Sequence, residues 1–208
     1  MARLSFFASL MSWLTQRAAP DPVFPPATGP APISPAIEPD FAIAWGARVS
    51  AAFKRKAIEI AHRLEMDPNH LMAIMAFETG RSFDPSETNR AGSGATGLIQ
   101  FMPATARDLG TTTAALATMS AVDQLDYVER YLNPYKGKMA DLESAYMAVL
   151  YPRGVDKEPG YVLFRKGSKA YKLNRGLDTN GNGYVTKTEA AAKVSVLLAE
   201  GLQPGVIG

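Results

Sequence analysis

Glu78 is the residue of this sequence best suited to acid–base chemistry, and it ends the apolar stretch LMAIMAFETG. Leu71, Ile74 and Met75 precede it at spacings that put all four side chains on one helix face. Burial at the edge of a core raises a carboxyl pKa, and the negative end of the helix dipole raises it further. A carboxyl that stays protonated near neutral pH can act as a general acid. The alternative is a glutamate that points into solvent or pairs with Arg81.

A glycine-rich segment, AGSGATGLIQFMPATA, occupies residues 91–106. Gly92, Gly94 and Gly97 match the G-x-G-x-x-G pattern of dinucleotide-binding loops. That function is excluded because the polar stretch DPSETNR precedes the pattern where a strand should stand, and the acidic ribose contact expected downstream is missing. The glycines instead let the backbone approach a ligand closely, and Gln100 can hydrogen-bond a sugar hydroxyl or amide. A carboxylic acid facing such a polar wall suits glycoside cleavage.

The segment DTNGNGYVTKTE matches the calcium-loop pattern of an EF-hand without a mismatch. The expected Ca²⁺ ligands are Asp178, Asn180, Asn182, Tyr184 through its backbone carbonyl, Thr186 directly or through water, and a bidentate Glu189. Gly183 would make the sharp turn of the loop. Only two of these ligands carry charge, and we find one such loop, so we expect a structural calcium site and not a sensor. The alternative is an Asn- and Gly-rich turn before a helix.

Helical patterns dominate the chain after residue 41 and predict a mainly α fold. Asp67 and Pro68 form an N-cap and first position, and Gly80 ends the same helix. Ser120 begins a capping box, and Asp141 caps a later helix. The expected helices cover residues 47–65, 68–79, 103–108, 122–132, 142–151 and 186–199, with one strand at 161–164.

Composition limits the classes of protein to which this chain could belong. The chain has 208 residues, of which 47% are hydrophobic and 20% are charged, enough for one good-sized domain with extensions. A net charge of +2 is too small to indicate nucleic acid as the main partner. The absence of cysteine excludes disulfides and thiolate chemistry. His62 and His70 lack zinc-site spacing, and the sequence has no G-x-S-x-G elbow.

The first 40 residues differ in composition from the rest. Residues 1–19 contain an apolar stretch after one arginine and resemble a secretory signal peptide or, alternatively, an amphipathic docking helix. Residues 20–40 contain eight of the fifteen prolines, which predicts a semi-rigid linker. The expected units are therefore residues 1–19, the linker 20–40, a main domain 41–175, a calcium loop with its helix 176–200, and a flexible tail 201–208.

Three segments, FETGRSFDP, GATGLIQFMPATA and SAYMAVLYP, resemble in order the three blocks of the soluble lytic transglycosylase catalytic domain. The resemblance spans roughly residues 48–152 and implies a mainly α, lysozyme-like α+β fold. It implies that Glu78 is the sole catalytic acid and base, and that the Tyr146 hydroxyl lies near its carboxyl. The substrate-binding residues taken from the resemblance are Thr79, Ser93, Gly97, Leu98, Ile99, Gln100 and Tyr146.

Four positions depart from the family pattern. Thr79 replaces the serine that usually follows the glutamate, and Ile99 replaces a methionine. Ala91 stands where a serine often orients the substrate's acetamido group, although Ser93 is close by. Met147 stands where the family has asparagine. These departures concern the details of substrate binding more than the class of reaction.

The resemblance implies cleavage of the MurNAc–GlcNAc β-1,4 bond of peptidoglycan, with a 1,6-anhydro product formed without water. A lysozyme-type hydrolase, or muramidase, is the nearest alternative and usually needs a second carboxylate, for which Asp84 and Glu87 are the candidates. A non-catalytic virion or cell-wall protein on the same scaffold is the third possibility. Four further aromatic residues could line a sugar groove: Tyr131, Tyr135, Tyr161 and Tyr171. Aromatic residues at such spacings more often belong to the core.

The expected partners are peptidoglycan glycan strands and, through residues 1–19, a virion or envelope protein; nucleic acid is not expected. The substrate lies in the bacterial periplasm or cell wall. A signal peptide would make the protein a secreted or periplasmic bacterial enzyme. A docking helix would suit a bacteriophage wall hydrolase carried in the virion. The compact size and the short tether favour the bacteriophage version.

Overall fold

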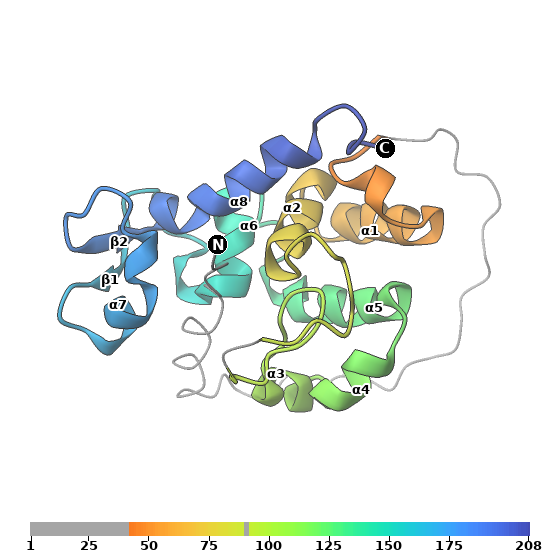
Figure 1. The fold of residues 1–208 in the computed structure, drawn as a ribbon, viewed down its shortest axis with the longest axis horizontal. Coiled ribbons are helices and arrows are strands. Elements are labelled where there is room, and N and C mark those ends of the chain that lie inside the picture. The colour runs from red at the N-terminus through yellow and green to blue at the C-terminus, as the bar shows by residue number, and fades with distance from the viewer. Residues whose placement is uncertain (1–41, 90–91) are drawn as a thin grey trace, which may run out of the picture.

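The computed structural model describes residues 42–89 and 92–208. The N-terminal segment 1–19, the linker 20–40 and Ala91 lie outside these residues. The described chain is mainly helical with a small two-stranded sheet, which confirms the expected fold class (Figure 1). The elements are α1 (Ala51–Arg63), α2 (Pro68–Glu78), α3 (Pro103–Asp108), α4 (Thr113–Thr118), α5 (Ala121–Leu132), α6 (Leu142–Leu150), β1 (Val162–Arg165), α7 (Lys169–Asn174), β2 (Tyr184–Thr186) and α8 (Lys187–Gly201). None of the described helices has both the length and the apolar character needed to cross a membrane.

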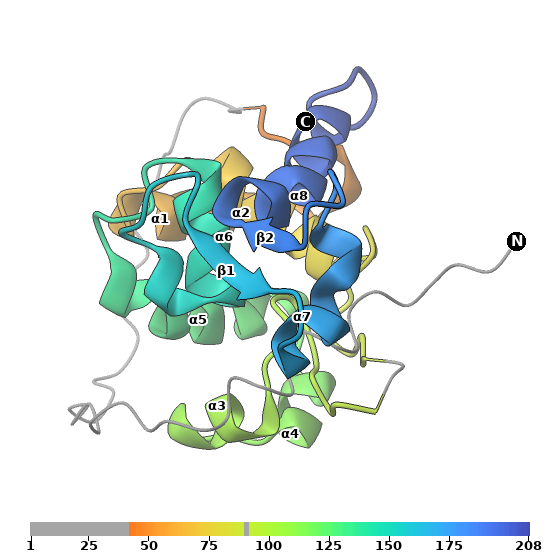
Figure 2. The same cartoon turned by 90° about the vertical axis from the view of Figure 1, so that its left-hand side faces the viewer.

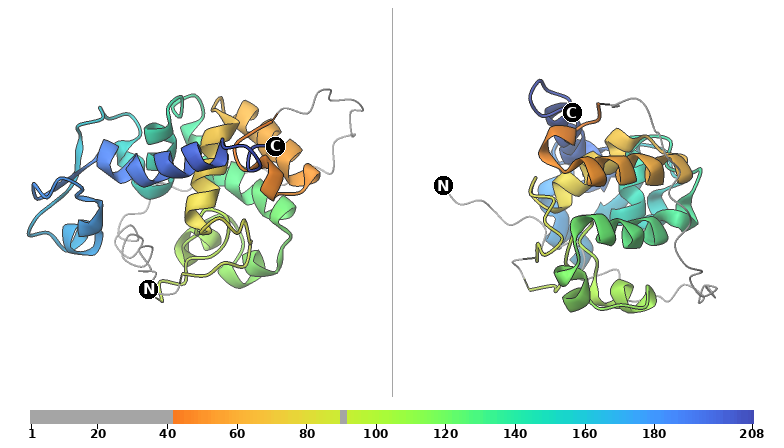
Figure 3. Two further views of the ribbon diagram at one scale, coloured as in Figure 1. Left: turned by 45° about the horizontal axis from the view of Figure 1, so that its top comes forward. Right: turned by 90° about the vertical axis from the view of Figure 1, so that its right-hand side faces the viewer.

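Helix α2 is the centre of the core. Every side chain from Leu71 to Ala76 is fully buried, so the helix is apolar on all faces and not only on one stripe. It packs against α1, α6 and α8. In the left view of Figure 3, α8 runs across α2. The C-terminal end of α2 extends beyond α8 toward the loop that follows α2. The element that carries Glu78 is therefore held from several sides.

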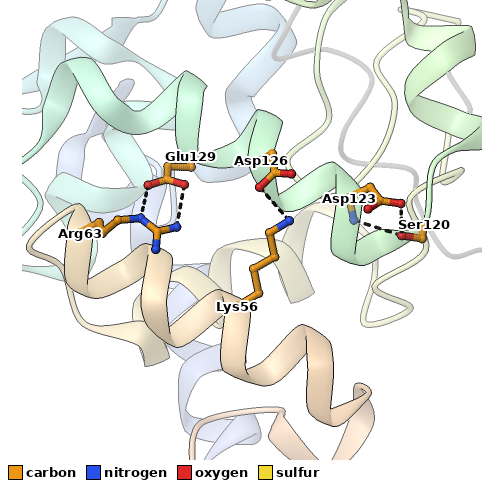
Figure 4. A network of polar contacts seen from close by, with 6 residues as sticks. All are labelled: Lys56, Arg63, Ser120, Asp123, Asp126 and Glu129. Atoms are coloured by element: carbon orange, nitrogen blue, oxygen red, sulfur yellow. Dashed lines mark hydrogen bonds and ion pairs between the residues drawn. The ribbon is translucent and has the colours of Figure 1, made fainter. Parts of the chain in front are cut away.

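Helices α1 and α5 pack side by side and are joined at the surface by two ion pairs (Figure 4). Lys56 Nζ lies 2.7 Å from Asp126 Oδ1, and Arg63 Nε lies 2.6 Å from Glu129 Oε1. Exposed pairs of this kind contribute only about 0.2–1 kcal/mol each. The buried apolar side chains between the two helices therefore hold them together, and the ion pairs favour their alignment.

The sheet and α7 form a projection at the left of the helices in Figure 1, and this part faces the viewer in Figure 2. Strand β2 pairs with β1 in antiparallel fashion, with Val185 opposite Phe164. At the start of α8 the ammonium of Lys187 is buried and donates to Ser144 Oγ, to the Val155 carbonyl and to the Lys157 carbonyl. These bonds tie the projection to α6, because one buried cation reaches both parts.

The two ends of the described chain meet. Ile43 N donates to the Gly208 carbonyl at 2.9 Å, and Gly208 N donates back at 3.2 Å. Ala47 N also donates to the Val206 carbonyl at 3.1 Å. The structure therefore corrects the expectation of a flexible tail at residues 201–208, because backbone hydrogen bonds fix this segment to the start of the domain.

Most expected helices are present, with differences in their limits. The first begins at Ala51 after an Ser50 N-cap, and the chain before it forms a short 3-10 turn at Gly46–Arg48. The expected strand lies one residue later, at Val162–Arg165. Two six-residue helices, α4 and α7, were not expected. Such short helices show too little of a 3.6-residue period to be recognised from the apolar pattern.

Candidate active site

Local caps place Glu78 at the end of α2. The Asp67 side chain accepts a hydrogen bond from Asn69 N, and Pro68 occupies the first turn, as the sequence predicts. Glu78 is the last residue of the helix, and Thr79 is its C-cap. Gly80 then takes a left-handed conformation with φ of 60°. The carboxyl therefore stands where the helix stops and its negative dipole end lies.

Burial is the physical cause of the raised pKa of Glu78. Its side chain is only 5% exposed, and burial raises the pKa of its carboxyl from 4.5 to about 8. Arg81 does not pair with it, because the Arg81 guanidinium binds the carboxylate of Glu200, with Nε 2.8 Å from Oε1. The pairing expected as one alternative is thus excluded. Within the described chain, no ion pair to Glu78 is present.

Two tyrosines lie close enough to Glu78 for its charge to act on them. Burial raises the pKa of the Tyr146 hydroxyl well above its ordinary value, and the charge of Glu78 raises it further. The Tyr131 pKa is also raised, by burial, by Tyr135 and by Glu78. The Tyr146 ring packs edge-on against Phe77 at 5.6 Å. The structure therefore brings the predicted Tyr146 to the candidate acid, and adds Tyr131.

Tyr131 also joins the parts of the site. Its hydroxyl donates to the Ala148 carbonyl of α6 at 3.1 Å, and its ring packs edge-on against Phe101 at 6.2 Å. Like the other tyrosines considered for a sugar groove, it is half-buried against the core. Its position between the glycine-rich loop and α6 favours a structural contribution to the site.

The glycine-rich loop is fixed by a residue that the sequence patterns do not single out. Gln124 of α5 is fully buried, and its Oε1 accepts a hydrogen bond from Leu98 N at 2.7 Å. Its Nε2 donates to the Pro85 and Leu116 carbonyls at 3.0 and 2.9 Å. A Cβ on Gly97, which has φ of 86°, would lie 2.3 Å from the Gln124 Oε1. The loop therefore needs glycine here because the glutamine amide occupies the space.

The predicted substrate-binding side chains are largely engaged inside the protein. Gln100 is 3% exposed, and its Nε2 donates to the Glu87 and Gly97 carbonyls. The Thr79 hydroxyl donates to the Met75 carbonyl. These groups hold the backbone of the loop and of the helix end. A direct contact of Gln100 or Thr79 with substrate stays a prediction.

The remaining predicted wall residues are placed in the same loop. Leu98 and Ile99 are buried, whereas Ser93 is half-buried and its Oγ accepts a hydrogen bond from Ala95 N at 3.2 Å. Met147 is fully buried, and its thioether lies against Gly154. At the position where the family has asparagine, this chain therefore has a core contact.

The two candidate second carboxylates do not act on Glu78. Asp84 is exposed and accepts hydrogen bonds from Ser86, which lower its pKa. Glu87 contributes its backbone carbonyl, which accepts hydrogen bonds from Gly97 N and Gln100 Nε2. The raised pKa of Glu78 has burial as its only cause, with no contribution from a neighbouring carboxylate.

The expected calcium loop is a closely hydrogen-bonded turn before α8. Asp178 accepts hydrogen bonds from Gly183 N at 2.9 Å and from the Tyr171 hydroxyl at 2.6 Å, and the latter bond lowers the pKa of Asp178. Asn180 and Asn182 also accept hydrogen bonds from N–H groups of the loop. Three side-chain oxygens of the expected ligand set are therefore gathered along one turn.

Glu189 lies at the other end of this loop. Its Oε2 accepts hydrogen bonds from Thr186 N and Oγ1 in a capping box, and its Oε1 accepts one from Thr179 at 3.2 Å. In the described parts of the chain, no group of three or more histidine, cysteine or acidic side chains is placed to hold a metal ion. The loop contains two carboxylates, Asp178 and Glu189, and side-chain oxygens of this kind are suitable Ca²⁺ ligands. Glu189 would have to give up its hydrogen bonds to Thr186 to bind the ion.

Comparison with known proteins connects this site to a family. Residues 55–148 match a family model described as "Transglycosylase SLT domain". The matched region runs from α1 into α6 and contains Glu78, the glycine-rich loop and Tyr146. No curated protein and no solved structure matches the chain. The match supports an SLT-type, lysozyme-like domain in this part of the chain, and domains of this family act on peptidoglycan outside the cytoplasm.

Proposed function

We propose that this chain is a lytic transglycosylase that cleaves the MurNAc–GlcNAc β-1,4 bond of peptidoglycan, with Glu78 as its single catalytic acid and base. The observation that carries this proposal is the buried Glu78 carboxyl at the end of α2, whose pKa is about 8. Such a group holds a proton at neutral pH and can release it to a substrate oxygen. The SLT match over the same region supports the choice of substrate.

The proposed reaction uses Glu78 twice. Its protonated carboxyl donates a proton to the glycosidic oxygen while the bond from that oxygen to C1 of MurNAc breaks. The oxygen keeps the bonding electrons and leaves as the 4-hydroxyl of GlcNAc, and the substrate's acetamido group stabilises the cationic C1. The Glu78 carboxylate then removes the proton of the C6 hydroxyl, whose oxygen bonds to C1. The product is a 1,6-anhydro sugar, and Glu78 is protonated again.

The surroundings of Glu78 favour this reaction over ordinary hydrolysis. Retaining glycosidases place two carboxyl groups about 5–5.5 Å apart, where each would influence the pKa of the other. Burial alone accounts for the pKa of Glu78, and Asp84 is held in an exposed turn by Ser86. A mechanism that needs one carboxyl group therefore suits this site better than one that needs two.

Mass spectrometry of the products from purified peptidoglycan tests the proposal. The wild type should release anhydro-muropeptides, and Glu78→Gln should release none, since the amide keeps the shape but loses the acid. Glu87→Gln, the matched change at a candidate second carboxylate, should leave the products and the rate unchanged. Reducing-end products would establish a hydrolase instead. The absence of products with either protein would favour a non-catalytic scaffold.

We also propose that the loop from Asp178 to Glu189 holds a structural Ca²⁺. The ligands would be the residues identified from the sequence pattern, and the ion would supply charge neutralisation and cross-linking of the turn to the start of α8. The support is the hydrogen-bonded turn that gathers Asp178, Asn180 and Asn182. Strand β2, within this loop, pairs with β1, so the ion would also stabilise the projection.

Thermal unfolding with added Ca²⁺ or with a chelator tests the metal site. An ion that binds only the folded protein stabilises it by about 2.7 kcal/mol at a hundred times its Kd. The Tm should therefore rise with Ca²⁺ concentration in the wild type and not in Asp178→Ala. Mg²⁺ at the same concentration is the control for ionic strength. A Tm that ignores Ca²⁺ and chelator alike contradicts the proposal.

The route to the cell wall is also a proposal. Residues 1–19 would act as a signal peptide in a secreted bacterial enzyme, or as a docking helix in a bacteriophage virion. Mass determination of the protein recovered from its natural source separates these routes. Loss of about the first 19 residues would indicate processing, and an intact N-terminus in purified virions would indicate docking.

A further inference from the structure

A pocket of about 250 Å³ opens between α2 and α8, beside the turn that follows Glu78. Most of its wall is apolar surface, and the uncharged residues that form it are Ala76, Phe77, Gly80, Val196 and Leu197. Val196 is 62% exposed, so a large apolar side chain stands at the rim of the pocket. We propose that the N-terminal segment of the same chain, residues 1–19, docks in this pocket.

The cationic groups of the wall do not call for an anionic ligand. Glu200 binds the Nε and one terminal nitrogen of the Arg81 guanidinium, so this charge already has its counterion. Burial lowers the pKa of Lys193, because surroundings of low polarity disfavour its charged form. The pocket therefore offers mainly apolar surface, and an apolar occupant gains most by leaving water there.

Residues 1–19 supply apolar side chains at the spacing that a groove between helices accepts. Leu4, Phe7, Met11 and Leu14 fall on one face of a helical pattern. Peptides that bind in apolar grooves commonly use anchors spaced three, four and seven residues apart in this way. The pocket is smaller than the about 300–1,000 Å³ of sites for drug-sized ligands. Its size therefore suits side chains that project from a peptide lying at the surface.

The tether of this segment begins next to the pocket. Trp45 Nε1 donates to the Leu197 carbonyl at 2.9 Å, and Leu197 lines the pocket. Figure 1 shows the start of the described chain beside the end of α8. The proline-rich residues 20–40 can extend to about 65 Å, at about 3.1 Å per residue. A tether of this length can turn back to the pocket, and covalent attachment raises the local concentration of the segment.

Docking would cover two apolar surfaces of the chain with each other. Exposed apolar patches on soluble proteins usually mark interaction sites. This pocket also adjoins the candidate acid, because Phe77 precedes Glu78 and its ring packs edge-on against Tyr146 at 5.6 Å. Residues 1–19 would thus lie beside the candidate active site until processing or a partner removed them.

The absence of cysteine from the chain allows a disulfide test in the full-length protein. Ala8→Cys places a thiol beside the apolar face of the segment, and Val196→Cys places one at the rim of the pocket. A disulfide forms only when the two Cα atoms come within about 7 Å of each other. Ser195→Cys is the matched control for Val196→Cys, because Ser195 is exposed on the same helix and lies outside the wall of the pocket.

Under mild oxidation in dilute solution, Ala8→Cys/Val196→Cys should form an intramolecular disulfide about tenfold faster than Ala8→Cys/Ser195→Cys. Mass spectrometry of proteolytic fragments identifies the linked positions and shows that the N-terminus is intact. Thermal unfolding confirms that both variants are folded, as expected for changes at exposed positions of α8.

Changes within the segment complete the test. Replacing Phe7 and Met11 by serine should slow the disulfide at position 196 to the rate of the control pair. Ser9→Ala, on the opposite face of the helical pattern, should leave that rate unchanged. The readout needs no peptidoglycan, so its outcome is independent of the proposed reaction.

Two results would overturn the proposal. Equal rates at positions 195 and 196 would show that the segment does not select the pocket. Disulfides that join two chains, in place of the intramolecular bond, would make a second copy of the protein the occupant.

Discussion

At the scale of single residues, two buried ionisable groups, Lys187 and Glu78, are treated differently by the fold. The Lys187 ammonium is 3% exposed and donates to three oxygens, so its hydrogen-bonding needs are met. Glu78 is about as deeply buried, yet burial without a charged partner raises its pKa to about 8. The fold stabilises the first group and leaves the second poised to give up a proton.

The cost of burying Glu78 predicts a pH dependence of stability. The carboxyl has a pKa of about 8 in the folded protein and near 4.5 when unfolded. Between these values the folded state holds a proton that the unfolded state has lost, so stability falls as the pH rises. Glu78→Gln does not titrate, so its free energy of unfolding relative to wild type should rise from pH 5 to pH 8, by at most about 1.4 kcal/mol per pH unit.

Urea unfolding at pH 5, 6.5 and 8 measures this difference. Glu65→Gln, at a surface glutamate that pairs with Lys136, provides the control. Its stability should follow that of the wild type at all three pH values. A constant difference between Glu78→Gln and wild type would show that the carboxyl titrates normally in the folded protein.

At the scale of elements, the glycine-rich loop owes its position to α5. The amide of Gln124 binds Leu98 N in the loop, the Pro85 carbonyl before it and the Leu116 carbonyl of α4. Three segments that are far apart along the chain thus share one buried side chain. The glycine-rich loop is therefore fixed to the helix that supports it.

Replacing Gln124 by alanine should loosen this wall. The change leaves buried N–H and carbonyl groups without partners and should destabilise the protein by about 2–4 kcal/mol. The wall residues would shift, so kcat/KM for peptidoglycan should fall about ten- to a hundredfold. Gln203→Ala, at an exposed amide that bonds only the Ala199 carbonyl, is the control and should change neither quantity.

Unfolding curves and initial rates measure the two effects of Gln124→Ala. If activity survived at the wild-type level while stability fell, the wall would not depend on Gln124 for its position during catalysis.

The sequence carries the signals that are local. The caps Asp67, Ser120 and Asp141 predict the starts of α2, α5 and α6, and the structure has all three. The roles of Gln124 and Lys187 are not predictable in this way, since a polar residue in a helical pattern normally indicates a solvent-exposed face. Their partners lie 8 to 43 residues away in the chain, so only the folded structure shows why they are buried.

The same distinction applies to the site. Glu78 is found from the sequence because its apolar neighbours recur at helical spacing. The sequence names Tyr131 only as an aromatic residue that could line a groove and is more often core. Its closeness to Glu78 is not predicted, because Tyr131 lies on another helix. The segment after α8 is missed for a similar reason, because its hydrogen bonds to Ile43 and Ala47 span nearly the whole domain.

At the scale of the whole molecule, hydrogen bonds attach the start of the domain to the end of α8. Trp45 Nε1 donates to the Leu197 carbonyl at 2.9 Å, and Trp45 N donates to the Gly201 carbonyl at 3.0 Å. The indole also lies against Gly201, where an added Cβ would come within 2.4 Å of the ring. Helix α8 therefore covers α2 and receives the N-terminal segment of the domain at the same time.

Gly201→Ala should disrupt the contact between Trp45 and the end of α8. Alanine normally stabilises a helix by about 1 kcal/mol relative to glycine, but here the methyl group would collide with a buried ring. Overpacking costs about 1–3 kcal/mol, and the close contact places this site at the upper end, so a net loss of about 2 kcal/mol is expected. Differential scanning calorimetry should show a lower Tm.

Gly160→Ala is the matched control, because a Cβ at Gly160 meets no atom within 4 Å. It should leave the Tm nearly unchanged. A Tm for Gly201→Ala equal to that of the wild type would mean that Trp45 can move away without cost.

The packing of α8 on α2 also bears on how the protein is made. A ribosome releases α2 long before it has synthesised Lys187–Gly201, so the part of the apolar surface of α2 that α8 covers stays exposed during most of translation. Contacts between segments so distant in the chain also slow folding. A nascent or prematurely terminated chain would thus lack the packing that α8 gives to α2, the helix that ends at Glu78.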